Sequence, residues 1–181
     1  MDVSETIIPN SEQVNAEDLL SGPRTVTITA VEAGSKEQPV FIHLAEFPER
    51  TYRPAKSMRR VLVFAWGPDS STYIGRQLTI YRDPTVKFAG AEVGGIRISH
   101  LSHIPERLEV QLAVTRGKRA PFVVDPIPVE LGEHLAALRA SKTLPELQAV
   151  WKAVVAAGVA SFPEVVAAKD ARKAEIAEAD K

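Results

Sequence analysis

Short runs in which apolar and polar residues alternate recur between residues 24 and 124. In the first run, residues 24–31, Val26 and Ile28 share one face while threonines occupy the other, which is the pattern of a half-buried strand. Turns containing glycine or proline separate it from further expected strands at residues 39–44, 74–82, 85–88, 93–100, 108–115 and 120–124. Many short strands at close spacing predict a small closed or partly closed β-barrel.

One apolar run inside this region, 56-KSMRRVLVFAWG-67, could form either a strand or a helix. We favour a helix, because its apolar residues recur at helical spacing, Ser57 can cap its start and Gly67 can end it. The helix would carry beside its apolar face a stripe made of Lys56, Arg59, Arg60 and Val63. Residues 46–57 are basic and interrupted by prolines, so we expect them to form a loop.

The composition changes after Pro126 and Pro128, where the chain becomes rich in alanine and helical in pattern. A first helix is expected at 131–138, and the capping boxes 143-TLPE-146 and 161-SFPE-164 predict the starts of two more. At the other end, residues 1–14 show no periodicity and are expected to be a flexible tail, after which Asn15 can cap a short helix. The sequence thus predicts a mainly β protein with appended helices, divided into a tail (1–14), a barrel domain with one embedded helix (15–127) and a C-terminal helical appendage (128–181).

The charge of the chain is distributed unevenly, although its formal net value is only -1. Residues 1–49 carry nine acids and two bases, residues 50–119 carry thirteen bases and five acids, and residues 120–181 carry seven bases and nine acids. A basic middle between acidic ends suggests a polyanionic partner. Two alternatives stay open: a solvated surface of scattered charge, or acidic ends that lie against the basic face and compete with a ligand.

The sequence offers little for catalysis or metal binding. It has no cysteine, which excludes disulfides and thiolate metal sites. His100 and His103 would point to opposite faces of a strand, and no phosphate-binding loop or nucleophile elbow is present. We therefore expect no enzymatic activity, no metal and no cofactor. The absence of a membrane-length apolar run and of a signal peptide predicts a soluble, cytoplasmic protein without membrane partners.

The basic segment has the features of a surface that binds single-stranded nucleic acid, where cations contact phosphates and aromatic rings stack on bases. In 76-RQLTIYRDPTVKF-88 the alternation places Arg76 and Arg82 on one side of a strand and Tyr81 on the other. Each ring could instead belong to the core, and Trp66 is the strongest core candidate. The nucleic-acid-binding candidates are Tyr52, Lys56, Arg59, Arg60, Tyr73, Arg76, Tyr81, Arg82, Lys87, Phe88, Arg97, Arg116, Lys118 and Arg119.

The same region resembles a group of bacteriophage and prophage proteins over roughly residues 15–127. The resemblance rests on a basic helix followed by Trp66-Gly67-Pro68-Asp69, Tyr73-Ile74-Gly75-Arg76, Leu78-Thr79-Ile80-Tyr81, Val86-Lys87-Phe88 and Ile96-Arg97-Ile98. One departure from the group's pattern is Ala89, where a second glycine is common before Gly90. No catalytic residues come with the group.

The resemblance implies an OB-fold-like protein that binds single-stranded DNA without sequence preference and supports phage replication or recombination in the cytoplasm of a host cell. Its C-terminal helices would then serve self-association or docking to other recombination or replication proteins. The alternative is a protein–protein interaction module that does not bind DNA, for which the acidic N-terminal segment and an apolar helix stripe at Trp151 are the best support.

Overall fold

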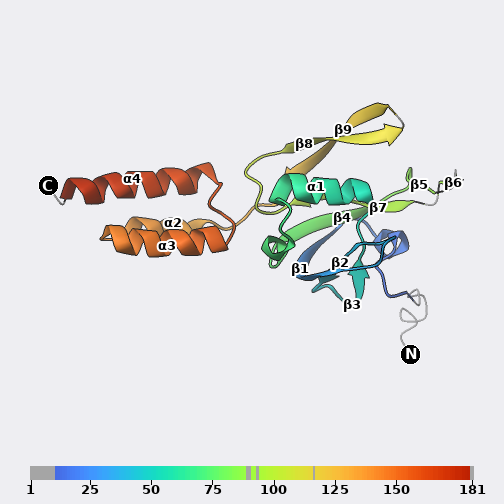
Figure 1. Ribbon diagram of the computed structural model, residues 1–181, viewed down its shortest axis with the longest axis horizontal. Coiled ribbons are helices and arrows are strands. Elements are labelled where there is room, and N and C mark those ends of the chain that lie inside the picture. The colour runs from blue at the N-terminus through green and yellow to red at the C-terminus, as the bar shows by residue number, and fades with distance from the viewer. Residues whose placement is uncertain (1–10, 89–90, 93, 116, 180–181) are drawn as a thin grey trace. The chain divides into compact units, whose positions relative to one another are not determined.

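The computed structural model describes residues 11–88, 91–92, 94–115 and 117–179, and the chain divides into two compact units (Figure 1). The first, here the sheet unit, takes the described residues up to Ser102 together with Arg107–Ile127. The second, the helical unit, takes His103–Glu106 and the described residues from Pro128 onward. The chain is thus mainly β with appended helices.

Seven strands form one mixed sheet in the order β3-β2-β1-β4-β7-β9-β8. Only β7 and β9 are parallel, and all other neighbours are antiparallel. The strands are β1 (Arg24–Ala33), β2 (Val40–Leu44), β3 (Phe47–Tyr52), β4 (Gln77–Asp83), β7 (Gly95–Leu101), β8 (Leu108–Thr115) and β9 (Lys118–Pro126); β5 (Lys87–Phe88) and β6 (Ala91–Glu92) pair separately. The described strands form an open sheet and not the closed form of the expected closed or partly closed barrel. Alternation identifies the two faces of a strand but not its neighbours, so it could not decide between an open and a closed arrangement.

The prediction of a loop at residues 46–57 is wrong, because Phe47–Tyr52 form the strand β3. Pro48 is tolerated there because β3 lies at the edge of the sheet. Proline has no backbone N–H, and on the outer side of an edge strand no neighbouring strand requires that donor. The segment before Asn15 covers this edge: Thr51 N donates to Glu12 O (3.0 Å), and Val14 N donates to Thr51 O (2.9 Å). Val14 is also buried, so residues 11–14 belong to the sheet unit and not to a flexible tail, while residues 1–10 lie outside the described residues.

The helix expected at 56–67 is present as α1 (Lys56–Trp66), which buries Met58, Val61, Leu62 and Trp66. Ile98 N of β7 donates a hydrogen bond to Met58 Sδ (3.3 Å), so the helix packs on the central strands. Gly67 follows the helix with φ 86°, as expected, but the cap position is Ala55 and Ser57 does not cap. Two short 3₁₀ helices, η2 (Ala16–Leu19) and η3 (Ser70–Tyr73), complete the unit.

The helical unit consists of α2 (Gly132–Ala140), α3 (Leu144–Ala156) and α4 (Pro163–Ala179) around a core of its own. The cap expected at the start of α3 is confirmed, because Glu146 N donates to Thr143 Oγ1. The Glu146 carboxylate differs from the expected capping box: its Oε2 accepts from Lys142 N at 2.7 Å, one residue before the cap. The core residues are Leu138, Leu147, Val154, Val159, Phe162, Val165 and Ile176. Three helices close a small core because each contributes one apolar stripe.

Candidate nucleic-acid interface

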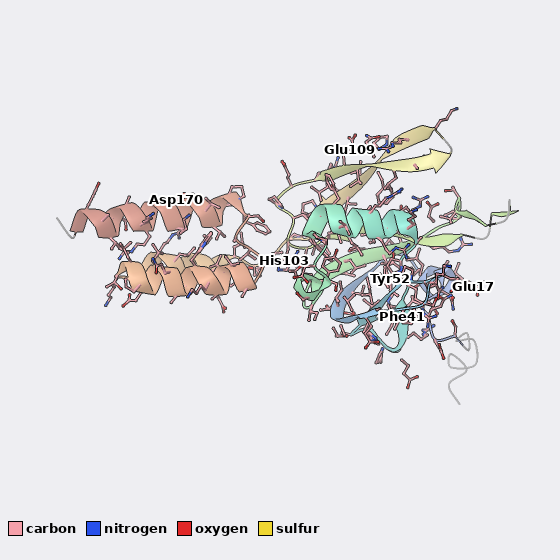
Figure 2. All side chains as sticks on the ribbon, viewed as in Figure 1. Glu17, Phe41, Tyr52, His103, Glu109 and Asp170 are labelled. Atoms are coloured by element: carbon pink, nitrogen blue, oxygen red, sulfur yellow. The ribbon has the colours of Figure 1, made fainter. Side chains whose placement is uncertain are left out.

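Two of the expected stacking rings lie in the core. Tyr52 lies among the strands of the sheet unit (Figure 2) and is 1% exposed. Tyr73 is 5% exposed. The Tyr73 hydroxyl donates to Gly67 O at 2.6 Å, and its ring meets that of Trp66 edge-on at 5.2 Å between centroids. Burial raises the pKa of both tyrosines. Neither ring can offer a face to a base, and both are corrected to core residues, whereas the core position expected for Trp66 is confirmed.

Tyr81 and Arg97 lie side by side on neighbouring strands, because their positions pair across β4 and β7. Arg97 Nε is 2.5 Å from Asp83 Oδ2, and its guanidinium carbon lies 5.5 Å from the centroid of the Phe122 ring. Burial, together with the nearby Asp83 carboxylate, raises the pKa of Tyr81 despite the opposing charge of Arg97. The charge of Arg97 is therefore balanced within the protein, and Tyr81 is a half-buried ring in a polar cluster.

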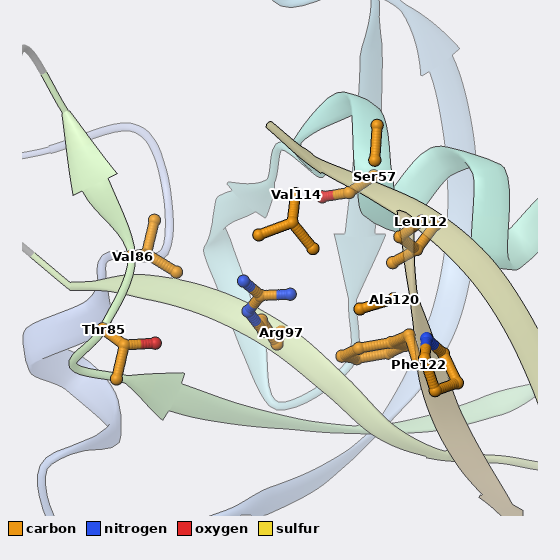
Figure 3. A pocket seen from close by; sticks show the side chains of 10 residues that line it. Ser57, Thr85, Val86, Arg97, Leu112, Val114, Ala120 and Phe122 are labelled. Atoms are coloured by element: carbon orange, nitrogen blue, oxygen red, sulfur yellow. The ribbon is translucent and has the colours of Figure 1, made fainter. Parts of the chain in front are cut away.

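A pocket of about 600 Å³ opens beside this cluster, between β7 and the β8–β9 hairpin (Figure 3). The Arg97 side chain extends into it, with Val86 on one side and Phe122 on the other. The pocket exists because β7 and β9 pair only at His100–Asp125 and Leu101–Pro126 and diverge beyond. Its lining is mostly apolar, with one arginine that already has an acidic partner.

Arg76 and Arg82 are also half-buried. The guanidinium carbon of Arg76 lies 5.3 Å from the centroid of the Trp66 ring, and burial lowers the pKa of Arg76. Arg82 Nε is enclosed without a hydrogen-bond partner among the described residues. Both side chains are held against the protein surface, so only some of their N–H groups can donate hydrogen bonds to a ligand.

The outer side of α1 combines two exposed cations, Lys56 and Arg60, and the half-buried Arg59 with an exposed ring. Lys56, Arg59 and Arg60 form no ion pair with any described carboxylate, and Phe64 is 61% exposed. Lys56, Arg60 and Phe64 follow each other at intervals of four, so they lie in one line along the helix. With Val63 and with Val110 of β8, these residues line an open pocket of about 500 Å³. We call Lys56, Arg59, Arg60, Val63 and Phe64 the α1 surface.

Phe64 is the residue that the sequence reasoning missed. In the expectation from sequence, Phe64 belonged neither to the apolar face of the helix nor to the stripe of Lys56, Arg59, Arg60 and Val63. The signal that could have found it is its spacing, because a residue four positions after Arg60 belongs to the polar stripe.

The remaining candidates lie on the two hairpins. Lys118 and Arg119 are exposed at the start of β9, whereas Arg116 lies outside the described residues. Lys87 and Phe88 form β5, but their side chains are likewise outside the described part of the structure. The distal part of the β8–β9 hairpin and the start of α1 line the same pocket through Val114 and Ser57 (Figure 3).

Several other cations of the basic segment are occupied by carboxylates. Arg50 pairs with Asp18 at 2.8 Å, and Arg53 pairs with Glu12 at 3.3 Å. Arg107 pairs with Asp125 at 2.6 Å. The acidic N-terminal segment thus neutralises part of the basic middle, which was one of the alternatives left open by the charge distribution, and the α1 surface stands out because its cations have no such partners.

In the described part of the chain, no three histidine, aspartate or glutamate side chains gather in a way that could hold a metal ion. Among the same residues, no helix is long and apolar enough to cross a membrane.

Comparison of the chain with protein-family models, with curated proteins and with solved structures found no match. The functional argument therefore rests on the fold and on the α1 surface.

Proposed function

We propose that the sheet unit binds single-stranded DNA without sequence preference, in support of replication or recombination, and that the α1 surface is its main contact. The observation that carries this proposal is the line formed by Lys56, Arg60 and Phe64, in which two cations free of described acidic partners stand next to an exposed ring. Cations that follow the phosphates and rings that stack on bases are the combination used by proteins that bind single strands.

The strand connectivity supports the proposal. β1 pairs with both β2 and β4, and α1 separates β3 from β4 along the chain. The OB-fold is a five-stranded, partly open barrel that binds oligonucleotides, and the run β3-β2-β1-β4-β7 likewise has five strands and stays open. We infer that β1–β4 and β7 are an OB-type core opened between β3 and β7, to which the β8–β9 hairpin is added.

Oligonucleotides bind OB-folds on the face of the second and third strands, which here are β2 and β3. Arg53 directly follows β3; its guanidinium carbon lies 4.2 Å from the centroid of the Phe41 ring in β2, and it pairs with Glu12, while Arg50 of β3 pairs with Asp18. A ligand there would first have to displace these contacts. The α1 surface requires no such displacement, which is why we place the main contact there.

Fluorescence anisotropy with a labelled oligo-dT and a duplex of equal length, each at low and at physiological salt, tests the function. We expect the single strand to bind more tightly than the duplex and its affinity to fall steeply with salt, because binding releases counterions. Absence of single-strand binding at low salt would end the proposal.

Substitutions test the site. Replacing Lys56 and Arg60 together by Gln should reduce the slope of log K against log salt by about 1.4, which is about 0.7 for each phosphate contact on a single strand. Phe64→Ala should cost about 1–3 kcal/mol of binding free energy if one base stacks on the ring. The matched control replaces Arg139 and Lys152, two exposed cations of the helical unit, by Gln and should leave the slope unchanged.

The variant Arg53→Gln distinguishes the two faces of the sheet unit. If it weakens binding more than the loss of Lys56 and Arg60 does, the DNA lies on β2 and β3 and the α1 site is wrong, although the function stands. The alternative is a protein–protein interaction module that does not bind DNA. We favour DNA binding over it because Glu12 and Asp18 pair with arginines and Trp151 packs against the core of the helical unit beneath Lys169.

A further inference from the structure

The two edges of the seven-stranded sheet are protected differently. β3 carries Pro48, and residues 12–14 cover it through hydrogen bonds to Thr51. β8 pairs with β9 alone, and within the described residues no backbone hydrogen bond outside that ladder reaches Leu108–Thr115. One edge is therefore closed by the chain itself, and the other is open.

β8 carries no proline, no lysine and no inward-pointing charge, three features by which soluble proteins keep an edge strand from pairing, and its register irregularity lies at its end, between Ala113 and Thr115. Its sequence is 108-LEVQLAVT-115, in which Glu109 is the one charge and accepts a hydrogen bond from Gln111 Nε2 at 3.0 Å. Val110 and Leu112 point inward and are buried, whereas Val114 is 67% exposed. An open strand of this length and composition is suited to accept another strand.

We propose that β8 pairs antiparallel with β8 of a second copy of this chain, so that two sheets join into one. The register centred on Gln111 fits best, because residues 108–114 then pair with 114–108 of the other copy. It sets Val110 opposite Leu112 on the buried face and Leu108 opposite the exposed Val114. A centre at Val110 pairs only residues 108–112 of the strand. A centre at Leu112 needs Thr115 and so crosses the whole irregularity between Ala113 and Thr115, whereas the centre at Gln111 reaches it only with its last residue, Val114.

The charges also agree with this register. Glu109 lies opposite Ala113 of the other copy, which keeps the two carboxylates apart, and the two Gln111 amides meet at the axis. Glu109, Gln111 and Ala113 are exposed and alternate along β8 with the buried Val110 and Leu112, so they lie on the opposite face of the strand. A twofold axis perpendicular to the sheet would bring both α1 helices to the same face of the joined sheet, because α1 and Val110 line one pocket.

Sedimentation equilibrium of the full chain without DNA, from micromolar to hundred-micromolar concentrations, tests the association independently of the proposed DNA binding. We expect a concentration-dependent dimer. A chain that stays monomeric over this range overturns the proposal and would leave the edge to a strand of a different protein.

Two substitutions of the same residue test the register. Ala113→Glu sets a carboxylate opposite Glu109 of the other copy on both sides of the axis, so the dimer should weaken about tenfold. Ala113→Gln, of the same size but uncharged, should leave it unchanged. Both should fold, because position 113 is exposed and lies opposite Arg119 in β9.

Cysteine cross-linking gives a second measurement. The chain contains no cysteine, so no native thiol can form a competing disulfide. Gln111→Cys places two thiols directly opposite each other at the axis and should form a disulfide-linked dimer under mild oxidation. Ala113→Cys, whose copies are offset by four residues along the strand, should not. A dimer that neither responds to Ala113→Glu nor cross-links through position 111 would show that the chain associates elsewhere and overturn the inference.

Discussion

At the scale of single residues, pairing decides which cations can meet a ligand. Arg50, Arg53 and Arg97 each lie within 3.3 Å of a carboxylate, whereas Lys56 and Arg60 have no described acidic partner. All five contribute equally to the charge counted along the sequence. The α1 surface can therefore be recognised only after the cations that pair with carboxylates are excluded.

Asp83 provides a test of such a pair. Burial alone would raise its pKa, but hydrogen bonds from Thr85 and the charge of Arg97 outweigh it and lower the pKa below the ordinary value of 3.8. The folded state then binds fewer protons than the unfolded state near that value, so the contribution of Asp83 to stability is complete above about pH 4 and is lost as the pH falls.

We expect Asp83→Asn to lower the free energy of unfolding by about 1 kcal/mol at neutral pH, with the difference from the wild type shrinking below about pH 4. Urea unfolding at a series of pH values measures it. A difference that stays constant through the acid range would show that the carboxylate charge contributes nothing.

At the scale of elements, α1 ends because of one backbone conformation. Gly67 has φ 86° and ψ 177°, a region that essentially only glycine occupies, and a Cβ atom there would meet no atom within 4 Å. The requirement for glycine is thus conformational and not steric.

Gly67→Ala should therefore destabilise the sheet unit by about 1–3 kcal/mol. The control is Gly132→Ala at the start of α2, where the Cβ also meets nothing and φ is not positive, so the change should be neutral or slightly stabilising. Thermal unfolding of the two variants measures the difference in stability. If both substitutions change the midpoint equally, alanine adopts the backbone conformation of Gly67 without an energetic cost and the prediction is wrong.

At the scale of the whole molecule, each unit has its own core and its own tryptophan. Trp66 is buried in the sheet unit, and Trp151 packs on the core of the helical unit. Units with separate cores are expected to unfold separately. The two tryptophans make this measurable.

In a Trp151→Phe background, Leu138→Ala removes a fully buried side chain from the helical unit and should cost that unit about 2–5 kcal/mol. The midpoint followed by helical circular dichroism should fall, while the midpoint followed by Trp66 fluorescence should stay in place. If both midpoints move together, the chain unfolds as one cooperative unit and the prediction is wrong.

The sequence alone determined what depends on neighbours along the chain. The buried face of β1, the span of α1 and the cap at Thr143 could be predicted, because periodicity and capping involve residues only a few positions apart. Even so, β3 was not predicted, because Pro48 argues against a strand that is not at the edge of a sheet. The position of β3 at the edge cannot be inferred from the local sequence.

Tertiary structure decided everything that joins distant segments. Tyr52 and Tyr73 lie in the core, and Arg97 and Arg53 pair with carboxylates. Phe64 is exposed beside Lys56 and Arg60. The sheet is open, with β8 at one edge. Alternation and composition are the same for a buried and an exposed tyrosine, and for a paired and a free arginine. The difference arises only when strands far apart in sequence meet, because burial and ion pairing depend on contacts in space.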